Sequence, residues 1–256
     1  MKSVFLYGDV SNNFEDVSIP FIQASGGSSA RIALLLQGGP EWEKYVPRYR
    51  DPWMRIGAEE VIPIAPTEDS SELDAEASDL LKQCTGIFIA GGDTRIYRNT
   101  YATERIGTLI KTLHESGVPY GGVSAGALIA PEKCTILGGK VTTPINEYIV
   151  RAREHLDLTK GNYVELSVDK GIGILKDCII EAHFSEFGGF PRLVQAMELT
   201  KSTYGFGIDE PICLEILDGT SVKVHGRGRA YTVKRIDSLK FKIIILEPGD
   251  HYEIKR

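Results

Sequence analysis

Residues 120–127 read Tyr-Gly-Gly-Val-Ser-Ala-Gly-Ala, and we interpret the rest of the chain as a scaffold that presents Ser124 from this stretch. The apolar run 118–123 leads into it like a buried strand, and small residues lie on both sides of the serine. A serine on a sharp strand-to-helix turn needs small neighbours, because the backbone there is strained and closely packed. The spacing G-x-S-x-G at Gly122, Ser124 and Gly126 therefore predicts a nucleophile elbow, although a plain strand–turn–helix junction gives the same pattern.

Backbone N–H groups near the serine are the expected partners of a developing negative charge. The first N–H groups of a helix have no carbonyl partner within it, so Ala125 offers one donor. The apolar run 86–90 predicts another strand, which ends at Gly91-Gly92-Asp93. Gly92 can bring a second N–H close to the target carbonyl, and the two donors together predict an oxyanion hole. A tight turn between a strand and a helix accounts for the two glycines equally well.

Strands and helices alternate along most of the chain, which predicts a parallel sheet with right-handed crossovers and ligands beyond the carboxyl ends of its strands. Apolar runs predict strands at 3–7, 31–37, 61–65, 86–90, 118–123 and 176–183. Apolar stripes and turn signals predict helices at 14–23, 41–56, 71–84, 106–113 and 191–199. The helix at 41–56 is broken by prolines, and Pro63 places its strand at an edge or a strand end.

The pattern changes after Gly205, where the apolar period becomes two. This predicts an antiparallel meander with strands at 211–216, 221–224, 230–234 and 241–246. We therefore expect an α/β catalytic domain over residues 1–210. Residues 211–256 are expected to form a β meander that packs on the same domain or extends it.

The composition is that of an ordinary globular protein, with 42% hydrophobic and 25% charged residues in 256. A net charge of −6 without a basic block argues against nucleic acid or an anionic membrane as the main partner. The N-terminal apolar run is too short for a signal peptide, and no stretch approaches a membrane span. The four scattered cysteines predict buried thiols in a reducing cytoplasm rather than disulfides or a metal site. We expect no cofactor and a monomer or homodimer.

A serine hydroxyl is a poor nucleophile until a base removes its proton, and the histidines are candidates for that base. His183 ends the buried strand 176–183 and meets a loop, where parallel-sheet enzymes place catalytic side chains. A structural histidine with satisfied hydrogen bonds at a strand end has the same spacing. The other histidines are expected on solvated faces or in the C-terminal strands and tail: His114, His155, His225 and His251.

Glu181 is the first candidate for a third residue, because strand side chains at i and i+2 share a face. It can orient the imidazole of His183 or line the same pocket, and it can equally be a carboxylate solvated at the end of the sheet. The pair Asp209-Glu210, which follows Gly205-Phe-Gly-Ile, is interpreted as a turn that can be purely structural. The sequence does not choose among the remaining acidic candidates between the serine and the histidine: Glu147, Glu154, Asp157, Glu165 and Asp169.

Together these stretches resemble the cyanophycinase and aspartyl dipeptidase (peptidase E-like) family of serine peptidases, which has a class I glutamine amidotransferase-like fold. The matching pieces follow the family's order from about residue 30 to 215: 86–93, 122–127, 171–175, 179–185 with Arg192-Leu193, and 205–210. The resemblance implies a three-layer α/β fold with helices on both faces of a mostly parallel sheet. It also implies a nucleophile at Ser124, its histidine at His183, and oxyanion donors at Gly92 and Ala125.

The chain departs from the cyanophycinase pattern around the same strand. The D-Q-H-F-S-x-R-G-R pattern of that branch becomes Glu-Ala-His-Phe-Ser-Glu-Phe-Gly-Gly over 181–189, so that Phe187 and Gly189 stand where two arginines are expected. Thr94 stands where a glutamine follows Gly-Gly-Asp. The serine and the histidine are 183 − 124 = 59 residues apart, which is more than in aspartyl dipeptidases. The resemblance therefore implies peptidase chemistry and leaves the peptide open.

The main hypothesis is a serine-type peptidase that hydrolyses a dipeptide or an isopeptide-like small peptide. Arg95 and Arg192 can hold a substrate carboxylate, because a guanidinium pairs with it bidentately. Glu186 can meet a free amino terminus, and Thr94 is a further candidate contact. One alternative is an α/β-hydrolase-like esterase with His251 as its base. Another is a non-catalytic binding or interaction module that retains the elbow as scaffold.

Overall fold

The computed structural model describes residues 1–67, 73–136, 166–237 and 240–255. Within them the largest sheet has eight strands in the order β14-β11-β10-β1-β5-β4-β2-β3. Its parallel part consists of β1 (Ser3–Tyr7), β2 (Arg31–Leu35), β3 (Glu60–Ile64), β4 (Gly86–Ile89) and β5 (Tyr120–Val123). The predicted fold class, a three-layer α/β protein with a mostly parallel sheet, is confirmed.

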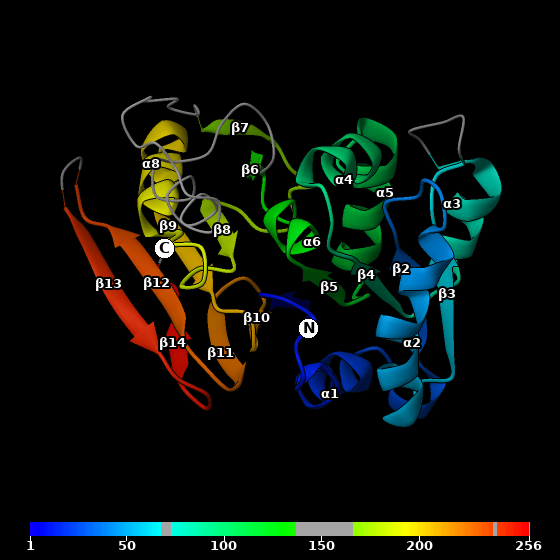
Figure 1. Cartoon of the computed structure of the whole chain (residues 1–256). Helices are drawn as coiled ribbons and strands as arrows, with labels where there is room; N and C mark the ends of the chain where they lie inside the picture. Colours follow the sequence, from blue (N-terminus) through cyan, green and yellow to red (C-terminus); the bar gives the residue numbers. More distant parts are fainter. Residues whose placement is uncertain (68–72, 137–165, 238–239, 256) are drawn as a thin grey trace, which may run out of the picture.

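Helices cover both faces of the sheet (Figure 1). In that view α1 (Phe14–Ala24) and α2 (Val46–Arg55) lie below the strands, whereas α4 (Thr94–Tyr101) and α5 (Glu104–Glu115) lie above them. The other helical segments are α3 (Ala75–Lys82), α6 (Ala125–Leu128), α8 (Phe190–Thr200) and the short η1 (Gly27–Ser29) and η2 (Trp42–Tyr45). None of the helices in the described ranges is long and apolar enough to cross a bilayer.

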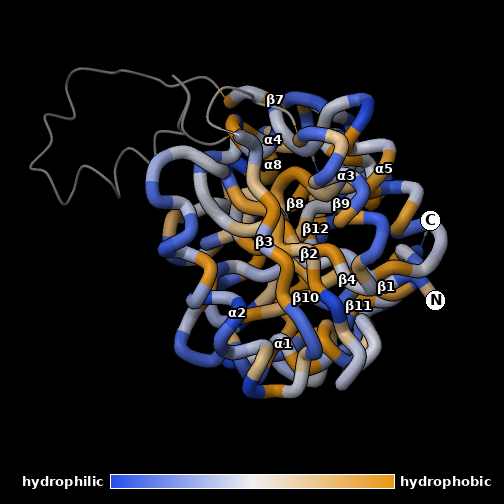
Figure 2. Tube along the Cα trace, turned by 90° about the vertical axis from the view of Figure 1, so that its right-hand side faces the viewer, coloured by the Kyte–Doolittle hydropathy of each residue, from blue (hydrophilic) through white to orange (hydrophobic). Residues whose placement is uncertain are grey.

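Apolar runs form the central strands because both faces of the sheet are covered. All five residues of β1 are buried, and the strands run as apolar segments through the interior in Figure 2. Strand β3 is the exception to this full burial. It carries Pro63 and is the edge strand at one end of the eight-stranded sheet. Proline cannot donate to a ladder, so it is tolerated on an edge strand. The edge position predicted from Pro63 is therefore confirmed.

Helix α4 was not among the predicted elements. Its sequence, Thr-Arg-Ile-Tyr-Arg-Asn-Thr-Tyr, is polar apart from one face that buries Tyr97 and Tyr101. The helix begins because the Asp93 side chain accepts hydrogen bonds from the N–H groups of Arg95 and Ile96. Such a cap stabilises a helix start by about 1 kcal/mol. The same cap fixes the direction in which the Gly91-Gly92 loop leaves β4.

The strands predicted over residues 211–246 form, but they do not make one continuous meander. A second sheet has the order β13-β12-β9-β8, in which β8 (Cys178–Ala182) and β9 (Tyr204–Ile208) are parallel. The hairpin β12 (Ala230–Arg235) and β13 (Phe241–Leu246) joins this sheet at β9. The remaining strands extend the large sheet beside β1: β10 (Ile212–Leu217), β11 (Ser221–Gly226) and β14 (His251–Glu253). The predicted boundary at residue 210 falls between β9 and β10, and the strands beyond it contribute to both sheets.

Strand β9 was missed because the two glycines in Tyr-Gly-Phe-Gly-Ile dilute the apolar signal, yet all five residues are buried. A Cβ at Gly205 would lie 2.5 Å from the Met197 sulfur and one at Gly207 2.5 Å from the Phe184 ring, so both glycines allow close packing. Met197 belongs to α8, which packs on β8 and β9. The short helix α6 packs against both β5 and β8 and thereby links the two sheets. Two further strands, β6 (Lys133–Ile136) and β7 (Ser167–Lys170), form an antiparallel pair.

Candidate active site

Ser124 has the backbone of a nucleophile elbow. Its φ and ψ are 50° and −112°, a conformation that non-glycine residues rarely adopt and that costs about 1–3 kcal/mol. The surroundings enforce it: the Ser124 N–H donates to the Tyr7 carbonyl at 3.1 Å. A Cβ at Gly122 would lie 2.5 Å from the Gly126 carbonyl oxygen, and one at Gly126 would lie 2.1 Å from that of Ile89. The glycines of G-x-S-x-G are therefore needed for the close approach of β5, α6 and β4.

The imidazole of His183 lies between the serine and a carboxylate. Its Nε2 is 3.0 Å from the Ser124 Oγ, and its Nδ1 is 2.9 Å from the Glu210 Oε1. The side chain of His183 is 13% exposed, so the two hydrogen bonds form in a largely desolvated place. The structure thus brings together the two residues that the sequence singled out, and it adds an acidic residue at the position that orients a base.

Glu181 does not take that third position, which corrects our first candidate. It lies in the all-buried β8, and its carboxylate forms an ion pair with the Arg192 guanidinium of α8. Burial raises the pKa of the Glu181 carboxyl, and the charge of Arg192 opposes this shift. The same pair removes Arg192 from the substrate side, because its guanidinium is buried against Glu181. The two residues hold α8 against β8.

This buried ion pair gives a stability prediction. We expect Arg192→Met to lower the free energy of unfolding by about 3–5 kcal/mol, because it leaves a buried carboxylate without its counter-charge. The measurement is urea unfolding followed by fluorescence. The double variant Glu181→Leu/Arg192→Met is the control, and it should recover much of the loss since neither charge remains. Equal stability of the single variant and the wild type would contradict the structural role.

Glu210 reaches His183 because β8 and β9 are parallel neighbours. Ala182 pairs with Ile208 in the register, so the residues that follow the two strands lie side by side. The Glu210 N–H donates to the Glu186 Oε1 at 3.1 Å, and its carbonyl accepts the Asp9 N–H at 3.1 Å. Glu210 could have been predicted as a carboxylate that follows a buried strand, if that strand had been recognised as a parallel neighbour of β8, which ends directly before His183. Because β9 was not predicted from the sequence, Glu210 was not recognised either.

The other acidic candidates do not reach the histidine in the described residues. Asp169 lies on β7 and forms an ion pair with Arg98 at 2.9 Å. Four further candidates lie outside the described residues: Glu147, Glu154, Asp157 and Glu165.

The Gly91-Gly92 loop is clamped beside the serine. Gly91 donates its N–H to the Tyr49 hydroxyl at 3.2 Å, and its carbonyl accepts the Tyr97 hydroxyl at 3.2 Å. Burial raises the pKa of both phenols, so both hydroxyls stay neutral. The peptide between Gly92 and Asp93 is held by Gln37, whose Oε1 accepts the Asp93 N–H at 2.8 Å. A Cβ at Gly91 would lie 3.3 Å from the Cβ of Ser124, which shows how close the loop passes.

Several N–H groups in this region have no hydrogen-bond acceptor among the residues that the structure describes, and two of them are the predicted oxyanion donors. One belongs to Gly92, between the two clamped peptides. The other belongs to Ala125, the first residue of α6, whose N–H has no intrahelical partner. Gly92 follows Gly91, which passes close to the Ser124 Cβ, and Ala125 directly follows Ser124. An oxyanion hole needs such N–H groups without partners, so Gly92 and Ala125 remain candidate donors.

A cavity of about 310 Å³ opens beside Ser124. Its walls come from the loops after β1, β2 and β4 and from η2 and α2. Aromatic rings dominate the wall formed by η2 and α2, where Arg48 supplies a guanidinium. The cavity is lined by Asp9, Leu36, Gln37, Gly38, Trp42, Tyr45, Arg48, Tyr49, Gly91, Gly92, Tyr97 and Ser124.

The predicted substrate contacts do not line this cavity. Thr94 is buried at the start of α4, and Arg95 is exposed on the same helix. Glu186 is engaged by the Glu210 N–H, and desolvation together with the nearby carboxylates raises the pKa of its carboxyl. Arg192 is enclosed in the ion pair described above. Sequence reasoning missed Arg48 because the segment 41–56 offered only a helix interrupted by prolines and no chemical motif.

The histidine ring also stacks on an aromatic neighbour. The rings of His183 and Phe187 are 4.9 Å apart and inclined by 29°, and the Phe187 N–H donates to the His183 carbonyl at 2.9 Å. Phe187 stands where the cyanophycinase pattern has an arginine. In this chain the position therefore places an uncharged ring against the imidazole.

The histidines predicted to be peripheral are placed as follows. His251 is exposed on the edge strand β14, away from β5, which removes the base of the esterase alternative. The His225 Nε2 lies 2.7 Å from the Glu215 Oε2. His155 lies outside the described residues. His114 is 5% exposed and its Nδ1 contacts the Val118 carbonyl, so its predicted solvated position is wrong, and burial lowers its pKa.

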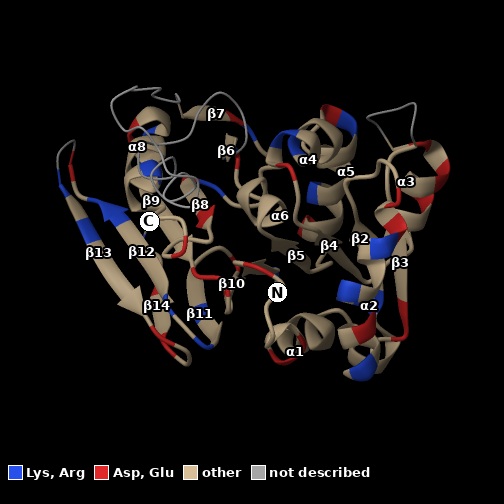
Figure 3. Cartoon of the chain, in the orientation of Figure 1, with Lys and Arg blue, Asp and Glu red and all other residues tan. Residues whose placement is uncertain are grey.

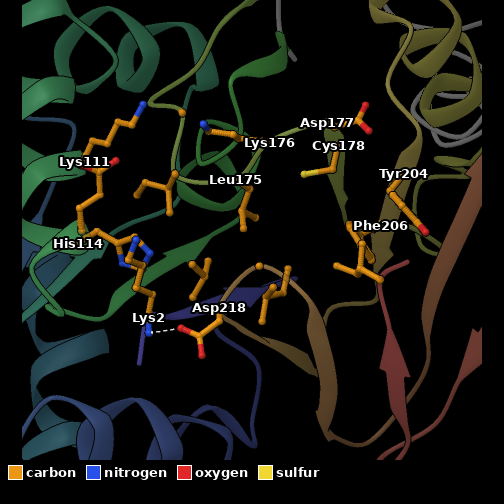
Figure 4. A pocket seen from close by; sticks show the side chains of 17 residues that line it. Lys2, Lys111, His114, Leu175, Lys176, Asp177, Cys178, Tyr204, Phe206 and Asp218 are labelled. Atoms are coloured by element: carbon orange, nitrogen blue, oxygen red, sulfur yellow. Dashed lines mark hydrogen bonds between the residues drawn. The ribbon is translucent and has the colours of Figure 1, made fainter. Parts of the chain in front are cut away.

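A second cavity, of about 240 Å³, lies away from Ser124 at the other end of β1 (Figure 4). Lys111 and His114 of α5 form one side, and Tyr204 and Phe206 of β9 form the other. None of the predicted catalytic or substrate residues lines it.

The buried thiols predicted from the sequence are confirmed. All four cysteines are buried, and no disulfide joins them. Burial raises the pKa of Cys84 to about 11 and that of Cys134 to about 12, so neither is a thiolate near neutral pH.

The sequence has relatives of known family. It matches peptidase family S51 over residues 8–224. It is 29% identical to a cyanophycinase of Synechococcus elongatus over 209 residues, which cover 81% of this chain and 60% of that protein. It is 26% identical to a cyanophycinase of Geminocystis herdmanii over 255 residues, which cover 92% and 86% of the two chains. The chain thus spans about 60% of the length of the first of these relatives.

Two solved structures share the fold. A peptidase from an acI-B1 Actinobacterium superposes with a TM-score of 0.71 and 18% identity, covering 99% of this chain and 97% of that one. A peptidase E protein from Listeria monocytogenes EGD-e gives a TM-score of 0.55 at 18% identity, covering 89% and 100%. At this identity the likeness concerns the fold alone.

Proposed function

The chain belongs to peptidase family S51, and from this premise we propose that it hydrolyses small peptides through an acyl-enzyme on Ser124. The observation that carries the proposal is the unbroken series of contacts from the Ser124 hydroxyl through the His183 ring to the Glu210 carboxylate. A serine, a base and an oriented carboxylate at hydrogen-bond distances are the parts that nucleophilic acyl transfer needs.

The proposed reaction assigns one task to each group. The Ser124 Oγ attacks the scissile carbonyl carbon while the His183 Nε2 takes its proton. Glu210 accepts the hydrogen bond of the Nδ1–H and stabilises the imidazolium that forms. The N–H groups of Gly92 and Ala125 hold the oxyanion. His183 then gives the proton to the leaving amine, and water releases the acyl group by the same steps in reverse.

The cavity suggests which peptides fit. A volume of about 310 Å³ favours a short peptide over an unfolded chain. Arg48 is the guanidinium that lines it, and it forms an ion pair with Asp9 at 3.3 Å with 48% of its side chain exposed. We assign the substrate carboxylate to Arg48, in place of Arg95 and Arg192. The rings of Trp42 and Tyr45 would then pack on the apolar part of the substrate.

This assignment predicts the effect of Arg48→Ala. We expect kcat/KM for peptides with a free carboxylate to fall by about 10- to 100-fold, since a charge-assisted hydrogen bond contributes about 1.5–3 kcal/mol. The amidated forms of the same peptides should lose little, because they make no ion pair. Arg50→Ala is the matched control, because Arg50 lies on the same helix and contacts Asp51 outside the cavity. An equal loss for acid and amide would contradict a carboxylate contact.

The proposal itself is tested by labelling and by a substrate screen. Wild-type protein should react with a fluorophosphonate, with the label on Ser124 in peptide mass spectra, and it should hydrolyse members of a dipeptide library. Heat-denatured protein is the control for non-specific labelling. A folded protein that takes no label and cleaves no peptide would favour the binding-module alternative instead.

A further inference from the structure

Three side chains of metal-ligand type converge at the catalytic imidazole. Asp9, His183 and Glu210 each offer one ligand atom, and these atoms all lie within 4.8 Å of one another. They come from the loops that follow β1, β8 and β9. Figure 3 shows acidic residues on the loops around β8 and β10. The proposed peptidase reaction uses His183 and Glu210 and gives no role to Asp9.

The main chain holds these three positions in place. The Asp9 N–H donates to the Glu210 carbonyl, and the Gly8 N–H donates to the Ile212 carbonyl, both at 3.1 Å. A Cβ at Gly8 would lie 2.1 Å from the Asp209 carbonyl oxygen, so the two loops are in direct contact. His183 is anchored next to them, because the N–H that follows it, that of Phe184, donates to the Ile208 carbonyl at 3.2 Å. The main chain that carries the three ligands is therefore in place before any ion arrives, and only side chains have to adjust on binding.

We propose that this cluster is an inhibitory zinc site formed by Asp9, Glu210 and the Nδ1 of His183. One imidazole nitrogen and two carboxylate oxygens are a donor set that suits Zn²⁺, which leaves a fourth tetrahedral position for water. Zinc bonds of about 2.0–2.2 Å separate tetrahedral ligand atoms by about 3.4 Å. The His183 Nδ1 and Glu210 Oε1 are 2.9 Å apart, so Glu210 has to draw back from the imidazole and Asp9 has to turn toward it when an ion binds.

Arg48 is the group that competes with the ion. Its guanidinium contacts the Asp9 carboxylate at 3.3 Å and also donates to the Val10 carbonyl at 2.9 Å. The pair is half-exposed, and such pairs contribute only about 0–1 kcal/mol. A divalent ion on three protein ligands binds far more strongly than that, and Arg48 keeps its carbonyl contact when Asp9 turns away.

Occupation of the site would reverse the hydrogen bond on which the proposed function rests. Neutral imidazole carries one proton, which lies on Nδ1 when the Nε2 accepts the Ser124 hydroxyl. A zinc ion that takes the Nδ1 lone pair leaves that single proton on Nε2. The Nε2–H then donates to the Ser124 Oγ and can no longer remove its proton. The ion also occupies the Glu210 carboxylate, so base and orienting group are lost together.

The site is tested by direct binding, which does not depend on peptidase activity. Isothermal titration of the untagged protein with ZnCl₂ should give one site per chain, and MgCl₂ should give none, because Mg²⁺ requires six near-octahedral oxygen ligands. Asp9→Asn and Glu210→Gln should each weaken zinc binding at least about tenfold. Arg48→Ala should strengthen it, because the competing cation is gone. His225→Ala is the matched control: it removes the other histidine–carboxylate contact, with Glu215, and should bind zinc as wild type does.

A second readout links the site to the serine. Zinc should slow fluorophosphonate labelling of Ser124 in the wild type, and a chelator should restore the rate, whereas Asp9→Asn should be labelled at nearly the same rate with and without zinc. Absent zinc binding, or binding that Asp9→Asn and Glu210→Gln leave unchanged, would overturn the proposal even if the protein proves to be a peptidase. Zinc binding with the expected variant pattern, in a protein that takes no label, would uphold the site and reject the peptidase.

Discussion

His183→Ala is expected to lower kcat for peptide hydrolysis by about 10⁴- to 10⁶-fold, and Ser124→Ala is expected to lower it by a similar factor. The hydroxyl is a weak nucleophile near neutral pH, and the imidazole is the group within hydrogen-bond distance of it, at 3.0 Å. Neither substitution should unfold the protein, because the main chain at both positions is held by backbone hydrogen bonds. The measurement is kcat on the best dipeptide of the screen, together with the thermal melting temperature.

The double variant Ser124→Ala/His183→Ala tests whether the two residues act together or contribute to kcat independently. Residues that act as one unit are strongly non-additive, so Ser124→Ala/His183→Ala should be no slower than either single variant. His225→Ala serves as the control for loss of a histidine elsewhere in the fold. If Ser124→Ala retained wild-type turnover, or if the two losses multiplied, the acyl-enzyme mechanism would be excluded.

Much of the fold follows from the apolar pattern alone. The strands of the parallel sheet are continuous apolar runs, and burial on both faces makes such runs readable in a sequence. What escaped prediction is explained by competing local effects. The glycines at 205 and 207 hide β9, since close packing against α8 and Phe184 there needs the absence of side chains. The two C-terminal hairpins were correctly read as strands, but periodicity carries no information about which sheet each hairpin joins.

The candidate site was predictable where one local motif specifies it. Ser124 is identified by the glycines around it, and His183 by its place at the end of a buried strand. Glu210 and Arg48 have no such local signature, because their roles depend on which loops the topology brings together. Glu181 had the spacing expected of a residue that orients His183, but its carboxylate forms an ion pair with the buried guanidinium of Arg192. A carboxylate on a buried strand must find a counter-charge, and sequence distance does not reveal which one.

Glu210→Gln should lower kcat by about 10⁴-fold while leaving KM within a few-fold of wild type. The amide of glutamine can present its NH₂ group to the imidazole, which favours the tautomer with the proton on Nε2. That tautomer cannot accept the proton of the Ser124 hydroxyl, so the base is lost although the geometry is kept. The carboxylate contacts the Nδ1 at 2.9 Å and does not line the substrate cavity, which is why the effect belongs to kcat.

Glu181→Gln is the matched control. Glu181 and Glu210 are both glutamates, and each lies within two positions of the end of its strand, β8 or β9, beside His183. Glutamine can still accept a hydrogen bond from Arg192. We therefore expect Glu181→Gln to lose some stability and to lower kcat by less than about tenfold. Glu210→Asp should lie between the wild type and Glu210→Gln, since a shorter carboxylate keeps the charge and lengthens the contact. If Glu181→Gln proved to be the slow variant and Glu210→Gln the active one, the carboxylate that serves the base would be the buried one. The two glutamates therefore decide whether the orienting charge reaches the imidazole from the parallel neighbour strand or from the histidine's own strand.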